Sequence, residues 1–69
     1  MSITITDKVG TSGAVTVDKL DVAESIHPWY ATGPDWAEAH EAVDKLQTAL
    51  TRGEATKDLE VFLGIEITR

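Results

Sequence analysis

Alternating apolar and polar positions at the start of the chain predict a β-hairpin. Ile3 and Ile5 alternate with Ser and Thr residues, which is the two-residue period of a half-buried strand. The next residues, DKVGTSG, have the composition of a turn, and the alternation resumes at Val15 and Val17. The apolar pattern then shifts by one residue, so we expect a bulge or bend near Asp18.

A helix is predicted over about residues 34–52. Pro34 suits the first turn of a helix, and Gly53 is a natural C-terminal stop. The apolar residues between them are spaced 3, 4, 3 and 4 apart, which places them on one stripe: Trp36, Ala39, Val43, Leu46 and Leu50. We therefore expect Trp36 to face the core.

The last eleven residues, LEVFLGIEITR, predict a long half-buried strand. Apolar residues occupy every odd position from Leu59 to Ile67, and Phe62 lies on the opposite, outer face. One helix with a single apolar stripe packs well on strands with one apolar face each. The sequence therefore predicts one domain over residues 1–69, a two-layer α+β sandwich of order β-β-α-β. In it the N-terminal hairpin and the long C-terminal strand form an antiparallel sheet packed on one helix.

The segment HPWYATGPDW, residues 27–36, concentrates the aromatic side chains. It holds both Trp residues and the only Tyr. We expect Trp29 and Tyr30 to close one end of the sandwich and to fix the angle at which the helix begins. Large aromatic residues also dominate binding hot spots, so Trp29 and Tyr30 are candidates for a partly exposed partner contact.

The charge of the chain favours a basic partner. Twelve acidic residues oppose six scattered basic ones, giving a formal net charge of −6. This balance argues against direct binding to nucleic acid or to an anionic membrane, because both need clustered basic side chains. An acidic face instead steers toward a basic protein surface, or serves solubility alone. The candidate acidic contacts are Glu38, Glu41 and Asp44 on the helix, with Glu60 and Glu66 on the last strand.

No arrangement of residues indicates catalysis, a metal or a cofactor. The chain has no Cys, and its serines lack the setting of a nucleophile. His27 and His40 are thirteen residues apart, which is not the spacing of a metal-binding motif. We expect His27 to have a role in a turn and His40 to lie at the edge of the core. The loop VGTSG precedes a strand, whereas phosphate loops precede a helix. Without a secretory signal or a long apolar run, we expect a cytoplasmic protein.

These observations favour a non-catalytic small acidic protein-binding module that acts on a basic partner surface. Accessory and inhibitor proteins of this size, including those that phages encode, often have such a composition, which is an analogy only. Two alternatives stay open. One is a small-ligand-binding or enzyme-subunit module that uses the aromatic loop 27–36 with His27, Trp29 and Trp36. The other is a self-associating structural subunit, a homo-oligomer that pairs through open sheet edges and covers Phe62.

Overall fold

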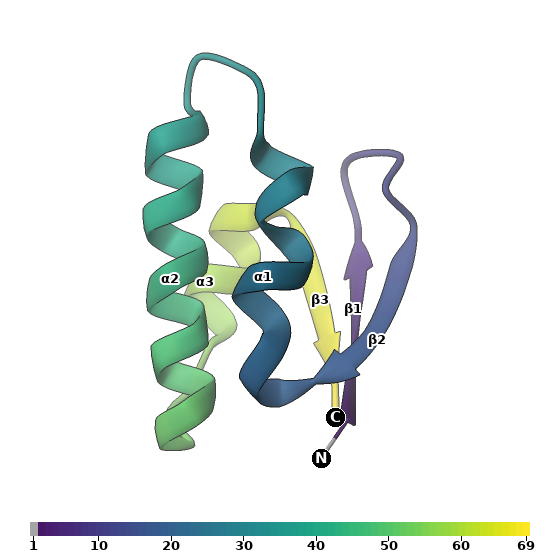
Figure 1. Ribbon diagram of the computed structural model, residues 1–69, viewed down its shortest axis with the longest axis vertical. Helices are drawn as coiled ribbons and strands as arrows, with labels where there is room; N and C mark the ends of the chain where they lie inside the picture. Colours follow the sequence, from purple (N-terminus) through teal and green to yellow (C-terminus); the bar gives the residue numbers. More distant parts are fainter. Residues whose placement is uncertain (1) are drawn as a thin grey trace.

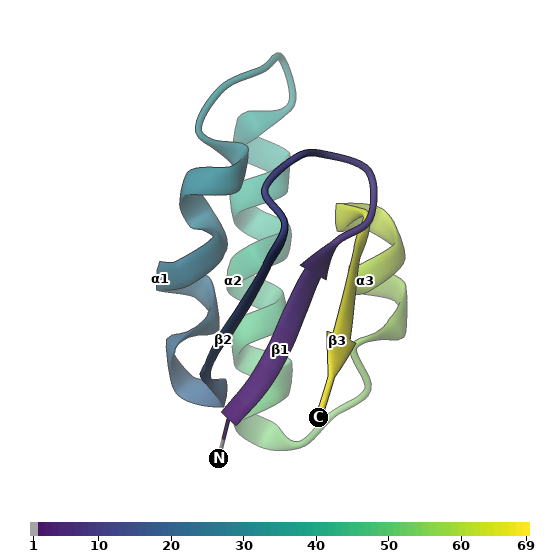
Figure 2. The same ribbon diagram turned by 90° about the vertical axis from the view of Figure 1, so that its right-hand side faces the viewer.

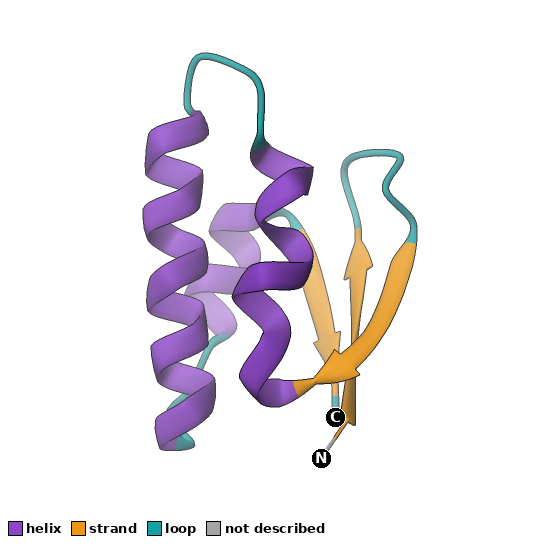
Figure 3. Ribbon diagram, in the orientation of Figure 1, coloured by secondary structure: helices purple, strands orange, loops and turns teal. Residues whose placement is uncertain are grey.

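The computed structural model describes residues 2–69 and has two layers, a sheet and a group of helices that covers one of its faces (Figures 1 and 3). The antiparallel sheet has the order β2-β1-β3. Its strands are β1 (Ser2–Asp7), β2 (Ala14–Asp18) and β3 (Ile65–Thr68), and the helices are α1 (Val22–Ile26), α2 (Trp36–Arg52) and α3 (Lys57–Leu63). The predicted α+β class, with its two-layer architecture and antiparallel sheet, is confirmed.

The N-terminal hairpin forms as predicted. Ile3 pairs with Val17 and Ile5 with Val15, so the apolar side chains of both strands share the face that the helices cover. At its far end β2 does not bulge, because the chain turns at Asp18 into a short 3₁₀ helix, η1 (Lys19–Asp21). The Asp18 carboxylate accepts a hydrogen bond from the Leu20 N–H, 3.0 Å long, and so caps this helix.

The connection between η1 and α2 contains helical structure that the sequence did not predict. It holds α1 and a second 3₁₀ helix, η2 (His27–Tyr30). Val22 and Ile26 lie one turn apart on α1 and are fully buried. The side chain of Gln47 on α2 fixes this segment, because it accepts from the Ala23 N–H and donates to the Lys19 carbonyl.

The predicted strand over residues 59–69 is wrong in its first half. Residues 57–63 form α3, Gly64 ends it with a φ of 69°, and only residues 65–68 form β3. Leu59 and Leu63 are spaced i, i+4, so the odd-position pattern that indicates a strand also gives a helix an apolar face. Consequently Phe62 lies on a helix and not on the outer face of the sheet.

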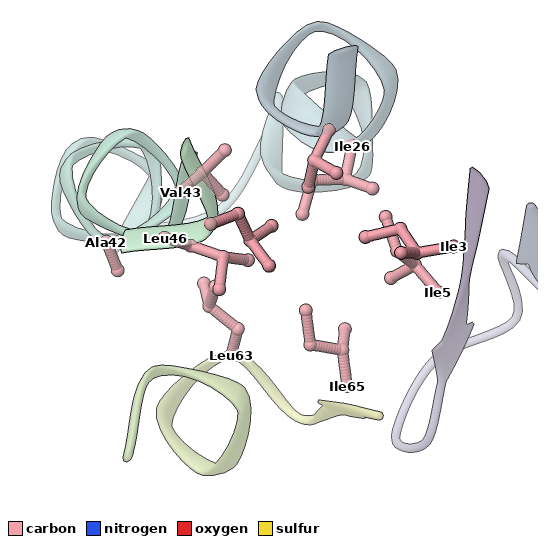
Figure 4. Packing of buried hydrophobic residues seen from close by; sticks show 10 residues of the cluster. Ile3, Ile5, Ile26, Ala42, Val43, Leu46, Leu63 and Ile65 are labelled. Carbon is pink, nitrogen blue, oxygen red and sulfur yellow. The ribbon is translucent and has the colours of Figure 1, made fainter. Parts of the chain in front are cut away.

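The core lies between β1, β3 and the three helices. Figure 4 shows Ile3 and Ile5 pointing toward Ile26, Leu46 and Ile65 from the surrounding elements. The predicted stripe of α2 is buried in its second half, at the residues Val43, Leu46 and Leu50.

The expectation that Trp36 belongs to the core is wrong. Its side chain is 52% exposed, and Ala39, one turn further on, is only half-buried. Burial therefore fades toward the start of α2, beside the loop of residues 31–35 at one end of the molecule (Figure 1). Trp36 is the first residue of the helix, so the stripe begins before the core does.

Candidate partner-binding groove

A groove follows α2 along the side where α3 packs against it. It consists of four open hollows, each of which shares lining residues with the next. Leu59 lines the first and second hollows, Phe62 the second and third, and Tyr30 the third and fourth. The groove therefore runs from Glu54, after the end of α2, to the loop around Gly33 before its start.

The floor of the groove is apolar. Leu59 and Phe62 contribute from α3, and Ala39 and Ala42 contribute from α2. The short alanine side chains fill little of the space between the two helices, which leaves the surface hollowed. Phe62 is 61% exposed there although it is a large hydrophobic residue. Such a side chain on a concave apolar surface is typical of a binding contact.

The rim of the groove is acidic. Of the described residues that line the four hollows, one is basic, Lys45, and five are acidic: Asp35, Glu38, Glu41, Asp44 and Glu54. Lys45 and Glu41 form an exposed ion pair of 3.3 Å one helical turn apart, so their charges offset each other and the other four carboxylates make the rim negative. The rim therefore presents a negative potential around the apolar floor, which attracts a positively charged partner.

Aromatic residues form the end of the groove next to the loop. Trp29, Tyr30 and Trp36 line the last hollow together with Pro34. Trp29 and Tyr30 also pack against the core, so they close the end of the sandwich as the sequence predicts. The Tyr30 hydroxyl donates a 3.0 Å hydrogen bond to the Leu63 carbonyl. Partial burial, helped by the negative charge of Asp7, raises the pKa of Tyr30 to about 12.

The two histidines fasten η2 to α2. The rings of His27 and His40 are stacked with centroids 4.7 Å apart, and His40 meets the edge of Trp36. Nε2 of His40 donates to the His27 carbonyl, and Nε2 of His27 lies 2.9 Å from an Asp44 carboxylate oxygen. These contacts give the histidines a role in positioning the aromatic end. Across residues 2–69, no group of three or more His, Asp or Glu side chains is arranged to hold a metal ion.

Six of the eight residues that the sequence nominates for partner binding line this groove. They come from three elements, η2, α2 and α3, and are Trp29, Tyr30, Glu38, Glu41, Asp44 and Phe62. The sequence reasoning missed the floor residues Leu59, Ala39 and Ala42. The i, i+3, i+4 spacing of Leu59, Phe62 and Leu63 is the signal for a helix on which the half-buried Leu59 and the exposed Phe62 lie beside each other.

The remaining two candidates, Glu60 and Glu66, lie elsewhere and interact within the chain. Glu60 accepts hydrogen bonds from the Thr56 hydroxyl and, at 3.0 Å, from the backbone N–H of Ile67 in β3. Glu66 forms an exposed ion pair of 3.4 Å with Lys8. Glu60 thus joins α3 to β3 and is not a free acidic contact.

The strand order shows which strands form the edges of the sheet. β1, which carries Ile3 and Ile5, is the central strand and is paired on both sides, so the sheet edges through which self-association is expected are those of β2 and β3. At the edge strand β3, the N–H of Ile67 is occupied by the carboxylate of Glu60. Figure 2 shows α3 lying beside β3 at this edge. Pairing through this edge would compete with that hydrogen bond.

Comparisons with protein-family models, with curated proteins and with solved structures give no match to this chain. Among the helices of residues 2–69, none combines the length and the apolar character that crossing a bilayer requires.

Proposed function

We propose that this chain is a non-catalytic protein-binding module whose groove between α2 and α3 binds a basic surface of another protein. The observation that carries the proposal is the position of Phe62. It is exposed on an apolar floor, and the acidic residues Glu38 and Glu41 line the same hollows. This combination supports a partner that offers apolar side chains flanked by Lys or Arg.

The two parts of the groove contribute differently to binding. Full burial of the Phe62 ring would contribute about 1.5–3 kcal/mol, which makes it the expected centre of the interface. The exposed rim carboxylates accelerate association and select basic partners, and they add less to affinity because water and salt screen them.

The shape and charge of the groove favour this function over the two alternatives. A small-ligand site is usually one enclosed pocket with converging polar groups, whereas the four hollows here are open and follow one another along a helix. A second copy of the chain would bring one acidic rim against another, and this repulsion opposes self-association through the groove.

A peptide selection tests the proposal. A random-peptide library is selected at low salt on the wild-type protein, and the enriched peptides are measured individually by fluorescence anisotropy. We expect peptides rich in Lys and Arg, whose affinity falls at least tenfold in Phe62→Ser and several-fold in the double variant Glu38→Gln/Glu41→Gln. The matched control is Val61→Ser, because Val61 is 70% exposed on the same helix and does not line the hollows described above.

The salt dependence provides a second criterion. Affinity should fall steeply as the ionic strength rises from about 50 to 300 mM, because the Debye length shrinks and the rim is screened. Enriched peptides that carry no net positive charge, or that bind equally well to wild type and Phe62→Ser, would refute the proposed function.

A further inference from the structure

We infer that the segment bound in the groove is an amphipathic basic α-helix. This inference rests on the proposed function and adds the conformation of the partner. The bound helix would lie between α2 and α3, place an apolar stripe on Leu59 and Phe62, and direct Lys or Arg side chains toward Glu38 and Glu41.

The backbone of the groove walls favours a helical partner over an extended one. In the middle of the groove both walls are helices, whose N–H and C=O groups are hydrogen-bonded within each helix except at the ends. An extended segment would find no backbone partners on these walls, and each of its polar groups that is buried against them without a partner costs free energy. A helical segment satisfies its own backbone, so it can bury its apolar side chains without this penalty. Strand addition needs a free sheet edge, and no sheet edge lines this groove.

The dimensions of the groove also suit a helix. The hollows follow the 17 residues of α2, a length of about 26 Å at 1.5 Å per residue. A partner helix of four to five turns would span that length, with apolar residues at i, i+3 or i+4, and i+7 along its contact face. One end of that stripe would meet the aromatic hollow at Tyr30 and Trp36, the middle would meet Phe62, and the other end would begin at Leu59.

The acidic rim selects the charge of this helix. Glu38 and Glu41 lie on one turn of α2 and face the second hollow together with Phe62. Lys or Arg residues that flank the apolar stripe of the partner would place their charges over these carboxylates while their aliphatic stems cover the floor. The same rim repels anionic lipid headgroups, so the apolar floor is not suited to an anionic membrane surface.

Three synthetic peptides of 18 residues, built from Leu, Lys and Gln, test the inference. The first carries Leu at helical spacing, and the second has the same composition but carries Leu at every other position. The third repeats the first with one central Gln replaced by Pro. Labelled peptides are titrated with the protein and followed by fluorescence anisotropy. Circular dichroism at 222 nm then reports whether the bound peptide has become helical.

We expect the helical-pattern peptide to bind best and to gain helical signal in the complex. The Pro peptide should bind at least tenfold more weakly, because Pro removes a helix hydrogen bond and distorts the helix. Phe62→Ser should weaken binding of the first peptide at least tenfold and Val61→Ser less than twofold. Thermal melts of both variants establish that they fold, as expected for side chains 61% and 70% exposed.

The outcomes separate this inference from the proposed function. If the alternating peptide binds as tightly as the helical one and still depends on Phe62, the helix inference is overturned while the groove remains a binding site. If none of the peptides depends on Phe62 or on the Glu38→Gln/Glu41→Gln change, and the library selection likewise yields no such ligand, both proposals are overturned.

Discussion

The hydroxyl group of Tyr30 lies 3.0 Å from the backbone carbonyl of Leu63, to which it donates a hydrogen bond. This bond joins η2 to the last residue of α3, across 33 positions of sequence. Both residues line the third hollow of the groove. The contact therefore couples the aromatic end of the groove to the helix that carries Phe62.

Removing this hydrogen bond should destabilise the protein modestly. We expect Tyr30→Phe to lower the free energy of unfolding by about 1 kcal/mol, because the Leu63 carbonyl loses its donor while the ring still packs against the core. Urea denaturation measures the change. The exposed pair Thr4 and Thr16, whose hydroxyls lie 3.0 Å apart on the sheet, gives a comparison: Thr4→Val should cost less. An unchanged stability of Tyr30→Phe would show that the bond contributes nothing.

The ionisation of Tyr30 should be shifted to high pH. Burial raises its pKa to about 12 from an ordinary value of 10.0. The stability linked to this group is complete below pH 10 and is lost as the pH rises toward 12, because the unfolded chain releases the proton first. Tyr30 is the only Tyr of the chain, so an absorbance titration near 295 nm follows it alone. A midpoint at 10, with the protein still folded, would contradict the burial of the hydroxyl.

The sequence predicted the hairpin and α2 because each carries a pattern that fits only one kind of element. Ile3, Ile5, Val15 and Val17 alternate strictly, and the stripe of α2 has helical spacing and a Gly53 stop. Residues 59–63 differ, since Leu59 and Leu63 satisfy both periods. The choice between them depends on Gly64 in a left-handed conformation, which turns the chain from a helix into a strand.

The candidate groove was predictable in its residue types and not in its form. Net negative charge and the clustering of aromatic residues point to Glu38, Glu41, Trp29 and Tyr30 from the sequence alone. The hollow itself exists because α3 is a helix that packs beside the alanines of α2 and exposes Phe62. That arrangement follows from tertiary packing, and it cannot be foreseen when residues 59–69 are predicted to form a strand.

Truncation of the exposed Trp36 should cost far less than truncation of a core residue. We expect Trp36→Ala to lower the free energy of unfolding by about 1 kcal/mol, mainly through the edge contact with His40. Leu46 is fully buried, so Leu46→Ala should cost about 2–5 kcal/mol and unfold much of the population. Thermal and urea denaturation compare the two variants. Equal losses would mean that Trp36 is packed in the core after all.

Acid should loosen the β1–β2 turn through Asp7. Partial burial raises the pKa of Asp7, but hydrogen bonds from the N–H groups of Gly10, Ser12 and Val9 outweigh it and lower the pKa below 3.8. A carboxylate whose pKa is lower in the folded protein stabilises the fold at every pH above its pKa in the unfolded chain. This contribution is lost as the pH falls below about 3.8. We expect Asp7→Ala to be less stable at pH 7 and to lose less stability on acidification than wild type. Urea denaturation at several pH values measures the change. If the free energy of unfolding falls with equal slope for both proteins between pH 4 and 2, Asp7 does not have this role.

The chain can tolerate a side chain at Gly53 better than at Gly64, although both end a helix with a positive φ of about 70°. At either position an Ala residue adopts the left-handed conformation at a cost of about 1 kcal/mol. A Cβ atom meets no other atom within 4 Å at Gly53, whereas at Gly64 it would lie 2.5 Å from a methyl group of Val9 in the β1–β2 turn. Gly64→Ala should therefore destabilise the protein more than Gly53→Ala, which urea denaturation measures.

A double variant identifies the origin of this difference. Val9→Ala removes both methyl groups that crowd Gly64, and Val9 is 81% exposed, so the single change should have little effect on stability. In the double variant Val9→Ala/Gly64→Ala the loss should shrink to that of Gly53→Ala, because only the backbone cost remains. If the losses of the two single variants simply add, the two residues do not touch. The β1–β2 turn would then lie further from the junction of α3 and β3 than expected from the 2.8 Å hydrogen bond between the Lys8 N–H and the Gly64 carbonyl.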